Sequence, residues 1–550
     1  MKNNFKIILS AVFLALFAGC PGFFADGNNV ITLDGNRASF TGTNINIISS
    51  PVYGTIAEIT GNGTYTVKGT LSQGFVSVAK RDLDVTIILD GANIFCRNYS
   101  ALVCLKNSNV TIVLAEGSVN KLSDGGIGMV DGRYPLGYDD TEQPNAALLI
   151  RRNLTIKGSG KLEVDSNGHN GIASRSHLRI EDGDITVSAR NNAIKGNDSV
   201  TITGGRFNIV SHKDAIVSET ILVGLGAINI SGGEFDITAG NDGIKAATSL
   251  TLDNASFKVK TGGGSTAGAL GAGVSAKGFR ASKDIIINSG SFDIDSNDDG
   301  INSSETVTIN GGTFEIASSD DGIQADKRLT IHSGNINIRR CFEGIESYDI
   351  DLYGGFLKIY SLDDGINVAG GADLGHGHEI SGSLTITGGE YYIESVGDGI
   401  DSNGNILMTG GTVVIFGPTY EPEVPIDYIG TFTMTGGTIA ALGLQGEEAQ
   451  QPSSSTQYSF LARFPENLPA SSLINVSSES GKEIITIESR KPAMGLVLCS
   501  PELEQGAYRI STGGAHSGTL NHLNLMTGGS YSGGTVIKTV TLNDFISQFD

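Results

Sequence analysis

The stretch Phe292–Ile323 reads FDIDSNDDGINSSETVTINGGTFEIASSDDGI and contains one phrase twice. In each copy a phenylalanine and an isoleucine two positions later lead to Asp-Asp-Gly-Ile, and the second copy begins 22 residues after the first. The alternating apolar residues indicate short β-strands, and the Gly-Gly and Asp-Gly pairs indicate turns. A unit this short cannot bury its own apolar face, so its repetition predicts a solenoid of stacked copies.

The same phrase recurs along most of the chain. The position of Phe292 is taken in other copies by Ile185, Phe207, Phe235, Phe257, Phe314, Ile336, Leu357, Tyr391, Val413 and Ile439. At the spacing of paired strands, roughly 4.8 Å, these side chains would form a ladder inside the solenoid. We therefore predict an all-β fold, a right-handed parallel β-helix with rungs of about 22 residues.

The period also predicts the domain organisation. The β-helix covers residues 31–442, and extra residues interrupt it in four places, around 219–226, 261–276, 369–381 and 417–425. Such insertions form loops on the rim and often flank the binding face. Residues 443–456 have the composition of a linker, and residues 457–550 are expected to form a small β domain. This domain would cap the last rung, whose edge would otherwise remain unpaired.

The first residues have the pattern of an export signal. Two lysines precede an apolar run and Cys20, which predicts a signal peptide over residues 1–19, lipidation of Cys20 and a tether over 20–30. The alternative is an ordinary cleaved signal beside a chance cysteine. The first interpretation predicts a bacterial cell-surface or periplasmic lipoprotein that contacts the membrane only through its lipid anchor.

Composition narrows the class of partner. The formal net charge is −22, which argues against nucleic acid, since nucleic-acid binding needs a basic footprint. We expect a monomer. A disulfide between Cys96 and Cys104 is compatible with export, but their spacing does not establish it.

The acidic pairs carry the main chemical prediction. Stacking the Asp-Asp-Gly-Ile phrases would build a column of carboxylates, and like charges at that separation raise one another's pKa and cost stability. Calcium resolves the conflict because it takes 6–8 oxygen ligands. The alternative is that Asp-Gly only shapes a turn. We favour calcium, with a first site between the two copies quoted above, and the predicted ligands are Asp242, Asp298, Asp299, Asp320, Asp321, Asp363, Asp364 and Asp398.

In each repeat the residue after the isoleucine of the phrase would point outward, and these residues form a second column. It begins with the basic residues Lys195, Lys245 and Arg280 and continues with Asn302, Gln324, Glu346, Asn367 and Asp401. The three cations, with Tyr134 and Tyr138 from a Gly- and Asp-rich loop, are candidates for contact with an acidic polysaccharide. In a lyase, Lys245 or Arg280 would take the proton α to the uronate carboxylate. The simpler interpretation is that these cations only pair with the acidic column.

These features together resemble one known family, a carbohydrate-binding β-helix family first described from a cellulolytic clostridium. The resemblance covers roughly residues 80–530, and it includes the rung phrase, the segment Ala146–Val164 (AALLIRRNLTIKGSGKLEV) and Cys499–Leu503 followed by Gly506 and Tyr508. It implies a β-helix similar to calcium-dependent pectate lyases, bound calcium, and affinity for cellulose or polygalacturonate without an established lyase activity. The chain departs from the pattern at the incomplete acidic pairs Asn192-Ala193, Asp214-Ala215 and Glu343-Gly344, so the resemblance does not extend a metal site to those rungs.

The sequence therefore predicts a surface lipoprotein that binds a polysaccharide, acidic (polygalacturonate-like) or cellulosic, in a calcium-dependent way. It favours a binding protein over an enzyme. Two alternatives stay open, a calcium-dependent uronate lyase and a non-catalytic adhesin.

Overall fold

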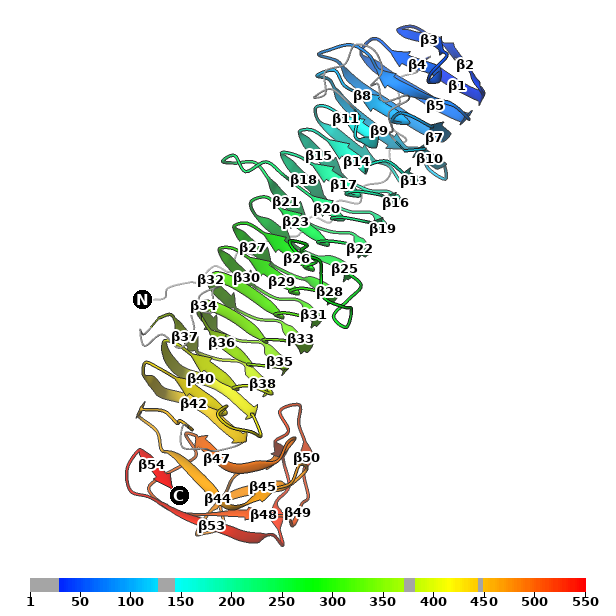
Figure 1. Ribbon diagram of the computed structural model, residues 1–550. Helices are drawn as coiled ribbons and strands as arrows, with labels where there is room; N and C mark the ends of the chain where they lie inside the picture. Colours follow the sequence, from blue (N-terminus) through cyan, green and yellow to red (C-terminus); the bar gives the residue numbers. More distant parts are fainter. Residues whose placement is uncertain (1–28, 127–143, 370–380, 444–448) are drawn as a thin grey trace, which may run out of the picture.

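The structure is a computed structural model that describes residues 29–126, 144–369, 381–443 and 449–550. Its described residues form strands, turns and loops, with no helix, and so none that could cross a membrane. The strands wind into a long rod that ends in a compact β region, seen in red and orange in Figure 1. Outside the described residues lie the predicted signal peptide over 1–19, most of the predicted tether over 20–30 with Cys20, and the two candidate tyrosines Tyr134 and Tyr138.

Each turn of the rod contributes one strand to each of three parallel stacks. The first stack carries the phenylalanines, the second follows the acidic turns, and the third precedes the Gly-Gly turns. Phe292 pairs in register with Phe314, and Ile301 pairs with Ile323. The predicted parallel β-helix with a 22-residue repeat is thus confirmed.

The strands of the first stack are β10 (Val119–Asp124), β13 (Lys161–Ser166), β16 (Asp184–Ala189), β19 (Arg206–Ser211), β22 (Glu234–Ala239), β25 (Ala255–Thr261), β28 (Gly290–Ser296), β31 (Thr313–Ser318), β33 (Asn335–Cys341), β35 (Phe356–Ser361) and β38 (Glu390–Glu394). Those of the second are β6 (Gly74–Val78), β8 (Leu102–Cys104), β11 (Ala146–Ile150), β14 (Asn170–Ser174), β17 (Ile194–Gly196), β20 (Ile216–Val217), β23 (Ile244–Ala246), β26 (Phe279–Ala281), β29 (Ile301–Ser303), β36 (Ile366–Val368), β39 (Ile400–Ser402) and β41 (Ile426–Tyr428).

Those of the third are β9 (Asn109–Leu114), β12 (Leu154–Lys157), β15 (His177–Ile180), β18 (Ser199–Ile202), β21 (Ala227–Ile230), β24 (Leu250–Leu252), β27 (Asp284–Ile287), β30 (Thr306–Ile309) and β37 (Ser383–Ile386). Longer strands run through two stacks: β5 (Gly63–Leu71), β7 (Asp84–Cys96), β32 (Ile323–Ile331), β34 (Ile345–Leu352), β40 (Asn405–Phe416) and β42 (Phe432–Gly443).

The core is a continuous ladder of apolar side chains. Phe207, Phe235 and Phe257 stack face to face with ring centroids 4.5 Å apart, and Phe292 and Phe314 continue the stack at 4.6 Å. All five rings are at most 3% exposed. Offset stacking and burial of aromatic surface both favour this arrangement, so the ladder fixes the register between rungs.

Hairpins and antiparallel strands close both ends of the rod. At the N-terminal end, β1 (Val30–Gly35) pairs with β2 (Arg37–Thr41), and β3 (Ile45–Ser50) pairs with β4 (Gly54–Ile59). At the other end, β47 (Ala493–Cys499) lies antiparallel on the last rung strand, β42. Both arrangements cover a strand edge that would otherwise be open.

The C-terminal region adds a second sheet and an apolar cluster that it shares with the last rungs. Alongside β47 lie β44 (Ser459–Leu468) and β54 (Ile546–Phe549), and a separate four-stranded sheet contains β46 (Glu483–Glu488), β45 (Leu473–Ser478), β48 (Gly506–Thr512) and β53 (Thr535–Leu542). Two short pairs lie outside this sheet: β49 (Ala515–His516) with β52 (Tyr531–Ser532), and β50 (Thr519–Leu520) with β51 (Met526–Thr527). The short strand β43 (Ser454–Ser455) pairs in parallel with β42 of the rod. Tyr392, Phe416 and Leu442 of the last rungs pack with Phe460 and Leu496 of this region in one apolar cluster.

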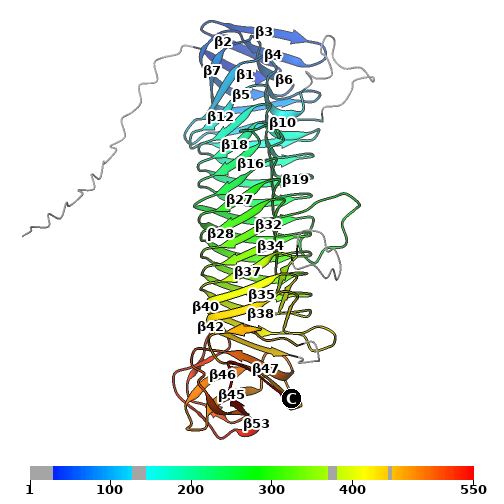
Figure 2. The same ribbon diagram turned by 90° about the vertical axis from the view of Figure 1, so that its left-hand side faces the viewer.

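The insertions leave the stacks at defined corners. Residues 262–276 join the first stack to the second, and they project from the side of the rod (Figure 2). Residues 417–425 lie at the same kind of corner, just before β41. Both insertions therefore end beside the acidic turns.

The open question on the cysteines is settled by packing. Cys96 and Cys104 are buried free thiols, and burial raises the pKa of each to about 11. They belong to different apolar clusters, so no disulfide joins them.

Candidate functional site

The turn between the first and second stacks repeats once per rung and builds a column of polar residues. We call it the acidic column, and its members are Asn170, Asn192, Asp214, Asp242, Lys277, Asp299, Asp321, Glu343, Asp364 and Asp398. The N–H group of the residue after each member donates to the carbonyl oxygen of the next member, at 3.1 Å from Ala193 to Asp214 and 2.9 Å from Gly300 to Asp321. Backbone hydrogen bonds thus hold the column in register.

One side-chain oxygen of most members has a structural role. The backbone N–H of Asp242 donates to Oδ1 of Asp214 at 3.2 Å, and that of Asp398 donates to Oδ1 of Asp364 at 2.7 Å. Asn192 does the same with its amide oxygen toward the N–H of Asp214. The turn-shaping interpretation therefore accounts for one oxygen per residue, and an asparagine suffices for it. The second carboxylate oxygen is left for another partner.

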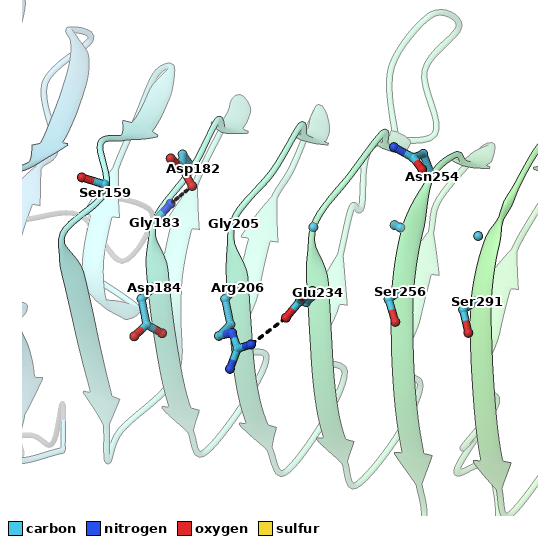
Figure 3. A pocket seen from close by; sticks show the side chains of 13 residues that line it. Ser159, Asp182, Gly183, Asp184, Gly205, Arg206, Glu234, Asn254, Ser256 and Ser291 are labelled. Atoms are coloured by element: carbon cyan, nitrogen blue, oxygen red, sulfur yellow. Dashed lines mark hydrogen bonds and ion pairs between the residues drawn. The ribbon is translucent and has the colours of Figure 1, made fainter.

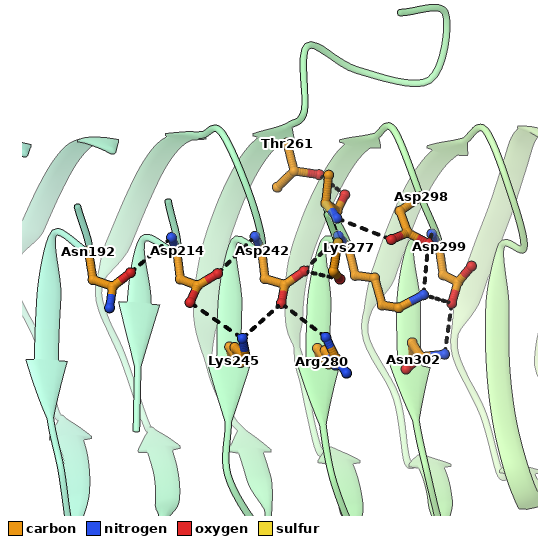
Figure 4. A network of polar contacts seen from close by, with 12 residues as sticks. Asn192, Asp214, Asp242, Lys245, Thr261, Lys277, Arg280, Asp298, Asp299 and Asn302 are labelled. Carbon is orange, nitrogen blue, oxygen red and sulfur yellow. Dashed lines mark hydrogen bonds and ion pairs between the residues drawn. The ribbon is translucent and has the colours of Figure 1, made fainter. Parts of the chain in front are cut away.

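In the N-terminal part of the column the chain supplies the partners as basic side chains. Asp242 is completely buried, and its Oδ2 lies 3.6 Å from Nη1 of Arg280 and 3.9 Å from Nζ of Lys245. Lys245 also lies 3.6 Å from Oδ2 of Asp214 (Figure 4). Burial raises the pKa of Asp214, and the charge of Lys245 opposes that effect. These contacts match the simpler interpretation of the predicted cations as partners of the acidic column.

Lys195 does not join this group. It pairs with Glu219 at 2.6 Å, and Val217 stands between it and Lys245 in the parallel register of the second stack. Of the three predicted cations, the structure thus brings only Lys245 and Arg280 together, on β23 and β26.

The next rung holds a lysine within the column itself. Nζ of Lys277 lies 2.7 Å from Oδ1 of Asp298 and 2.5 Å from Oδ2 of Asp299, and Asn302 donates to the same Oδ2 at 2.7 Å. Burial raises the pKa of Asp299, whereas at Asp298 the hydrogen bond and charge of Lys277 outweigh burial and lower the pKa. Asp320 completes this cluster of carboxylates, and burial raises its pKa.

The C-terminal part of the column gathers carboxylates without such cations. Three clusters have carboxylate oxygens within 4.8 Å of one another: Asp321 with Glu343 and Glu346; Asp364 with Asp398 and Glu423; Asp398 with Asp401 and Asp427. Among the described residues, no lysine or arginine forms an ion pair with Asp321, Glu343, Asp364 or Asp398.

The pKa values show what this crowding costs. Burial, with the charge of neighbouring carboxylates, raises the pKa of Glu343 to about 8 and that of Asp364 to about 8. The same causes raise the pKa of Asp321 and Asp398 well above the usual range. Burial and neighbouring charge therefore disfavour the ionised forms of these residues, and a bound cation would stabilise them.

The predicted ligands divide among these clusters. Asp298, Asp299 and Asp320 lie together with Lys277, Asp321 lies in the next cluster, and Asp364 and Asp398 share a third. Asp242 lies apart with its two cations, and no carboxylate cluster found among the described residues includes Asp363.

Sequence reasoning missed several members of these clusters. Glu346 and Asp401 belong to the second outward column, and Asp427 continues it in register with Asp401, so the change of that column from basic to acidic was the available signal. Glu343 substitutes for aspartate in the phrase. Glu423 comes from the insertion 417–425, where the repeat gives no register.

A separate groove runs along the turns between the third and first stacks (Figure 3). It holds about 900 Å³ and crosses several rungs, lined by Asp184, Arg206, Glu234, Ser256 and Ser291. Arg206 and Glu234 pair across adjacent rungs at 2.8 Å. Glycines also line this groove. A Cβ on Gly205 would lie 2.9 Å from the carbonyl oxygen of Gly183, so close packing between rungs explains the glycine at this position.

Comparison with known proteins adds a family. The model of a family described as carbohydrate-binding domain-containing protein matches residues 53–322 and 317–455. A protein of that description from Acetivibrio thermocellus is 36% identical over 197 residues, which cover 34% of this chain and 65% of that relative. A solved structure described as a polysaccharide lyase-like protein from C. thermocellum, as a gadolinium derivative, is 35% identical, with a TM-score of 0.39 and coverage of 43% of this chain and 92% of that one.

Proposed function

Because the chain belongs to the family of carbohydrate-binding domain-containing proteins, we propose that it binds an acidic or cellulosic polysaccharide through calcium held by the C-terminal part of the acidic column. The observation that carries the calcium part of this proposal is the set of carboxylate clusters around Asp321, Asp364 and Asp398. Asp321 and Asp398 are buried and Asp364 is half-buried, and among the described residues no lysine or arginine forms an ion pair with any of the three.

The donor set fits calcium. The clustered ligand atoms are all carboxylate oxygens, the hard donors that calcium prefers, and each cluster offers three residues toward a demand of 6–8 ligands. A bound ion would stabilise the ionised carboxylates and would leave coordination positions for water or for a ligand. Zinc is less suited because no histidine or cysteine belongs to these described clusters.

Net charge gives calcium a further role toward an acidic glycan. A chain with a net charge of −22 repels a polyuronate at long range. Calcium at the column would reverse the sign of the local charge and could bind glycan carboxylates directly. An acidic polysaccharide would then bind only in the presence of the ion, whereas a neutral glucan would depend on it less.

The lyase alternative receives no support from the positions of the candidate bases. Lys245 and Arg280 each lie near a buried carboxylate of the column, so both side chains already have an ionic partner within the protein. We therefore propose a binding protein. The adhesin alternative remains a prediction, and so does export as a lipoprotein anchored at Cys20.

The test is binding with and without calcium. Calorimetric titration of the full chain with calcium, followed by affinity electrophoresis on polygalacturonate and on soluble cellulose derivatives, should show calcium binding and glycan retardation that chelator abolishes. The double variant Asp364→Asn, Asp398→Asn should bind fewer calcium ions, because two of the three clusters lose ligands, and should be retarded less by the glycan. A matched control, Glu502→Gln with Asp544→Asn, removes two exposed carboxylates of the C-terminal region and should behave as the native chain.

Two results would overturn the proposal. The first is the absence of calcium binding at millimolar concentration. The second is retardation on polygalacturonate that chelator does not change. Release of unsaturated products, followed by ultraviolet absorbance, would instead establish the lyase.

A further inference from the structure

Lys277 occupies a position that carboxylates or amides occupy in every other described rung from Asn170 to Asp398. The N–H of Gly243 donates to the carbonyl oxygen of Lys277 at 2.9 Å, and the N–H of Gly278 donates to that of Asp299 at 3.0 Å. These are the hydrogen bonds that define the acidic column. Lys277 is therefore a member of the column by its backbone and an exception by its charge.

The ammonium group of Lys277 lies where the carboxylates converge. It is within hydrogen-bonding distance of Asp298 and Asp299, and the three side chains are 16%, 14% and 3% exposed. Asp298, Asp299 and Asp320 form one of the four carboxylate clusters of the described chain. In this cluster the chain itself provides the positive charge, whereas no basic side chain pairs with Asp321, Glu343 or Asp364 among the described residues.

The preceding insertion fixes the lysine in place (Figure 4). Oγ of Ser275 donates to Oδ1 of Asp242 at 2.6 Å, and the N–H of Ala276 donates to Oδ2 of Asp298 at 3.1 Å. Asn297, in the following rung, donates to the carbonyl oxygens of Gly262 and Gly268 at 3.1 and 2.9 Å. The insertion is thus bound to the rungs on both sides, and Lys277 is not a loosely held surface lysine.

We propose that Lys277 is a built-in substitute for a metal ion, which neutralises Asp298 and Asp299 and keeps calcium out of their rung. The calcium-binding part of the column then begins at Asp321. A second cation beside the ammonium would face strong repulsion at these distances. This inference rests on the proposed function in one respect, that calcium is the ion bound by the rest of the column.

The test removes the ammonium group of Lys277 and measures how many calcium ions the chain binds. Lys277→Met keeps the aliphatic chain and removes the charge, so it should raise the calcium stoichiometry of the full chain by one ion in calorimetric titration. Its melting temperature should become more dependent on calcium than that of the native chain. Lys277→Arg should add no ion, because the charge remains. Lys327→Met is the matched control, since Lys327 makes an exposed pair with Glu305 at 2.6 Å outside the column.

The outcomes separate this inference from the proposed function. If the native chain binds calcium and Lys277→Met binds the same number of ions, Lys277 does not take the place of an ion, and the proposed function stands. If Lys277→Met binds one ion and the native chain binds none, Lys277 does take the place of an ion, and calcium binding elsewhere in the column is overturned. No ion in either protein overturns both.

A second set of variants keeps the proposal testable if Lys277→Met does not fold. Recovery of folded Lys277→Met only in calcium would itself support the proposal. If that variant folds in neither condition, Lys277→Gln decides by the same ion count, because glutamine suits a column that already contains asparagine. Adding Asp298→Asn and Asp299→Asn to the lysine variant should remove the extra ion, and its retention would contradict the assignment of the site.

Discussion

The acidic column has two parts with the same backbone and different chemistry. From Asp214 to Asp299 each carboxylate lies near Lys245, Arg280 or Lys277, whereas from Asp321 to Asp398 the neighbours are further carboxylates. The inter-rung hydrogen bonds are alike in the two parts, 3.0 Å from Ala215 to Asp242 and 2.9 Å from Gly365 to Asp398. The difference therefore comes from the side chains beside the turn. The repeat sets where a carboxylate lies, and its neighbours determine whether it needs an ion.

The largest effect should come from removing the internal cation. Without calcium, Lys277→Met leaves the buried Asp299 without its ionic partner, and breaking a buried pair costs about 3–5 kcal/mol of unfolding free energy. Urea denaturation in chelator would measure this loss. The exposed pair of Lys327 should contribute only about 0–1 kcal/mol, so a loss of that size for Lys277→Met would show that the two parts of the column do not differ as described.

Asp364→Asn should stabilise the chain in chelator and weaken calcium binding when calcium is present. In chelator it removes a half-buried carboxylate from a crowded cluster while keeping the oxygen that accepts the N–H of Asp398, so it should stabilise the chain by about 1 kcal/mol. In calcium it removes a ligand, and the affinity for one ion should fall at least about tenfold. Parallel denaturation and titration experiments would show the reversal. Destabilisation in chelator would contradict it.

The pH dependence should also distinguish the two parts. The folded-state pKa of Glu343 and Asp364, about 8 in each case, lies above the unfolded values of 4.5 and 3.8, so the folded chain binds more protons than the unfolded chain between these limits. Their contribution to stability is fully present below about pH 4 and is lost as the pH rises toward 8. In chelator, the melting temperature should thus fall between about pH 5 and about pH 8. Saturating calcium should remove most of this fall, and a flat profile in chelator would argue against strained carboxylates.

The smallest effect should follow Lys245→Ala. Lys245 is 40% exposed and lies 3.6 Å from Asp214, so solvent screens the pair and the loss should not exceed about 1 kcal/mol. Calcium and polygalacturonate binding should remain unchanged, as measured by calorimetry and affinity electrophoresis. Loss of glycan binding in this variant would instead return Lys245 to the carbohydrate contact that the sequence suggested.

Much of this architecture follows from the sequence because the repeat leaves few alternatives. The 22-residue spacing of Phe292 and Phe314 places one above the other, and the alternation on either side fixes which residues face the core. The acidic column follows in the same way, since each Asp-Gly-Ile has a constant distance from the preceding strand. Physical regularity over many rungs is what made these predictions correct.

The sequence could not resolve the site where the repeat is interrupted. Lys277 follows the insertion 261–276, so counting from Asp242 does not show that it takes a column position. Glu423 likewise belongs to an insertion, and its approach to Asp364 and Asp398 depends on the path of that loop. The carboxylates, Lys245 and Arg280 could be identified from the repeat, whereas the pairing of Lys277 depends on three-dimensional contacts that the repeat does not contain.

The closed ends of the rod have a consequence for how such a chain can change. Because hairpins cover one end and β47 covers the other, growth by addition at the ends would uncover an edge, but insertion or loss of a whole unit between them would not. A duplicated unit would bring its own carboxylate and its own backbone bonds to the neighbours above and below. The number of ions that the column binds could then change by one with each unit gained or lost during evolution. A single lysine in one unit would be enough to remove one ion.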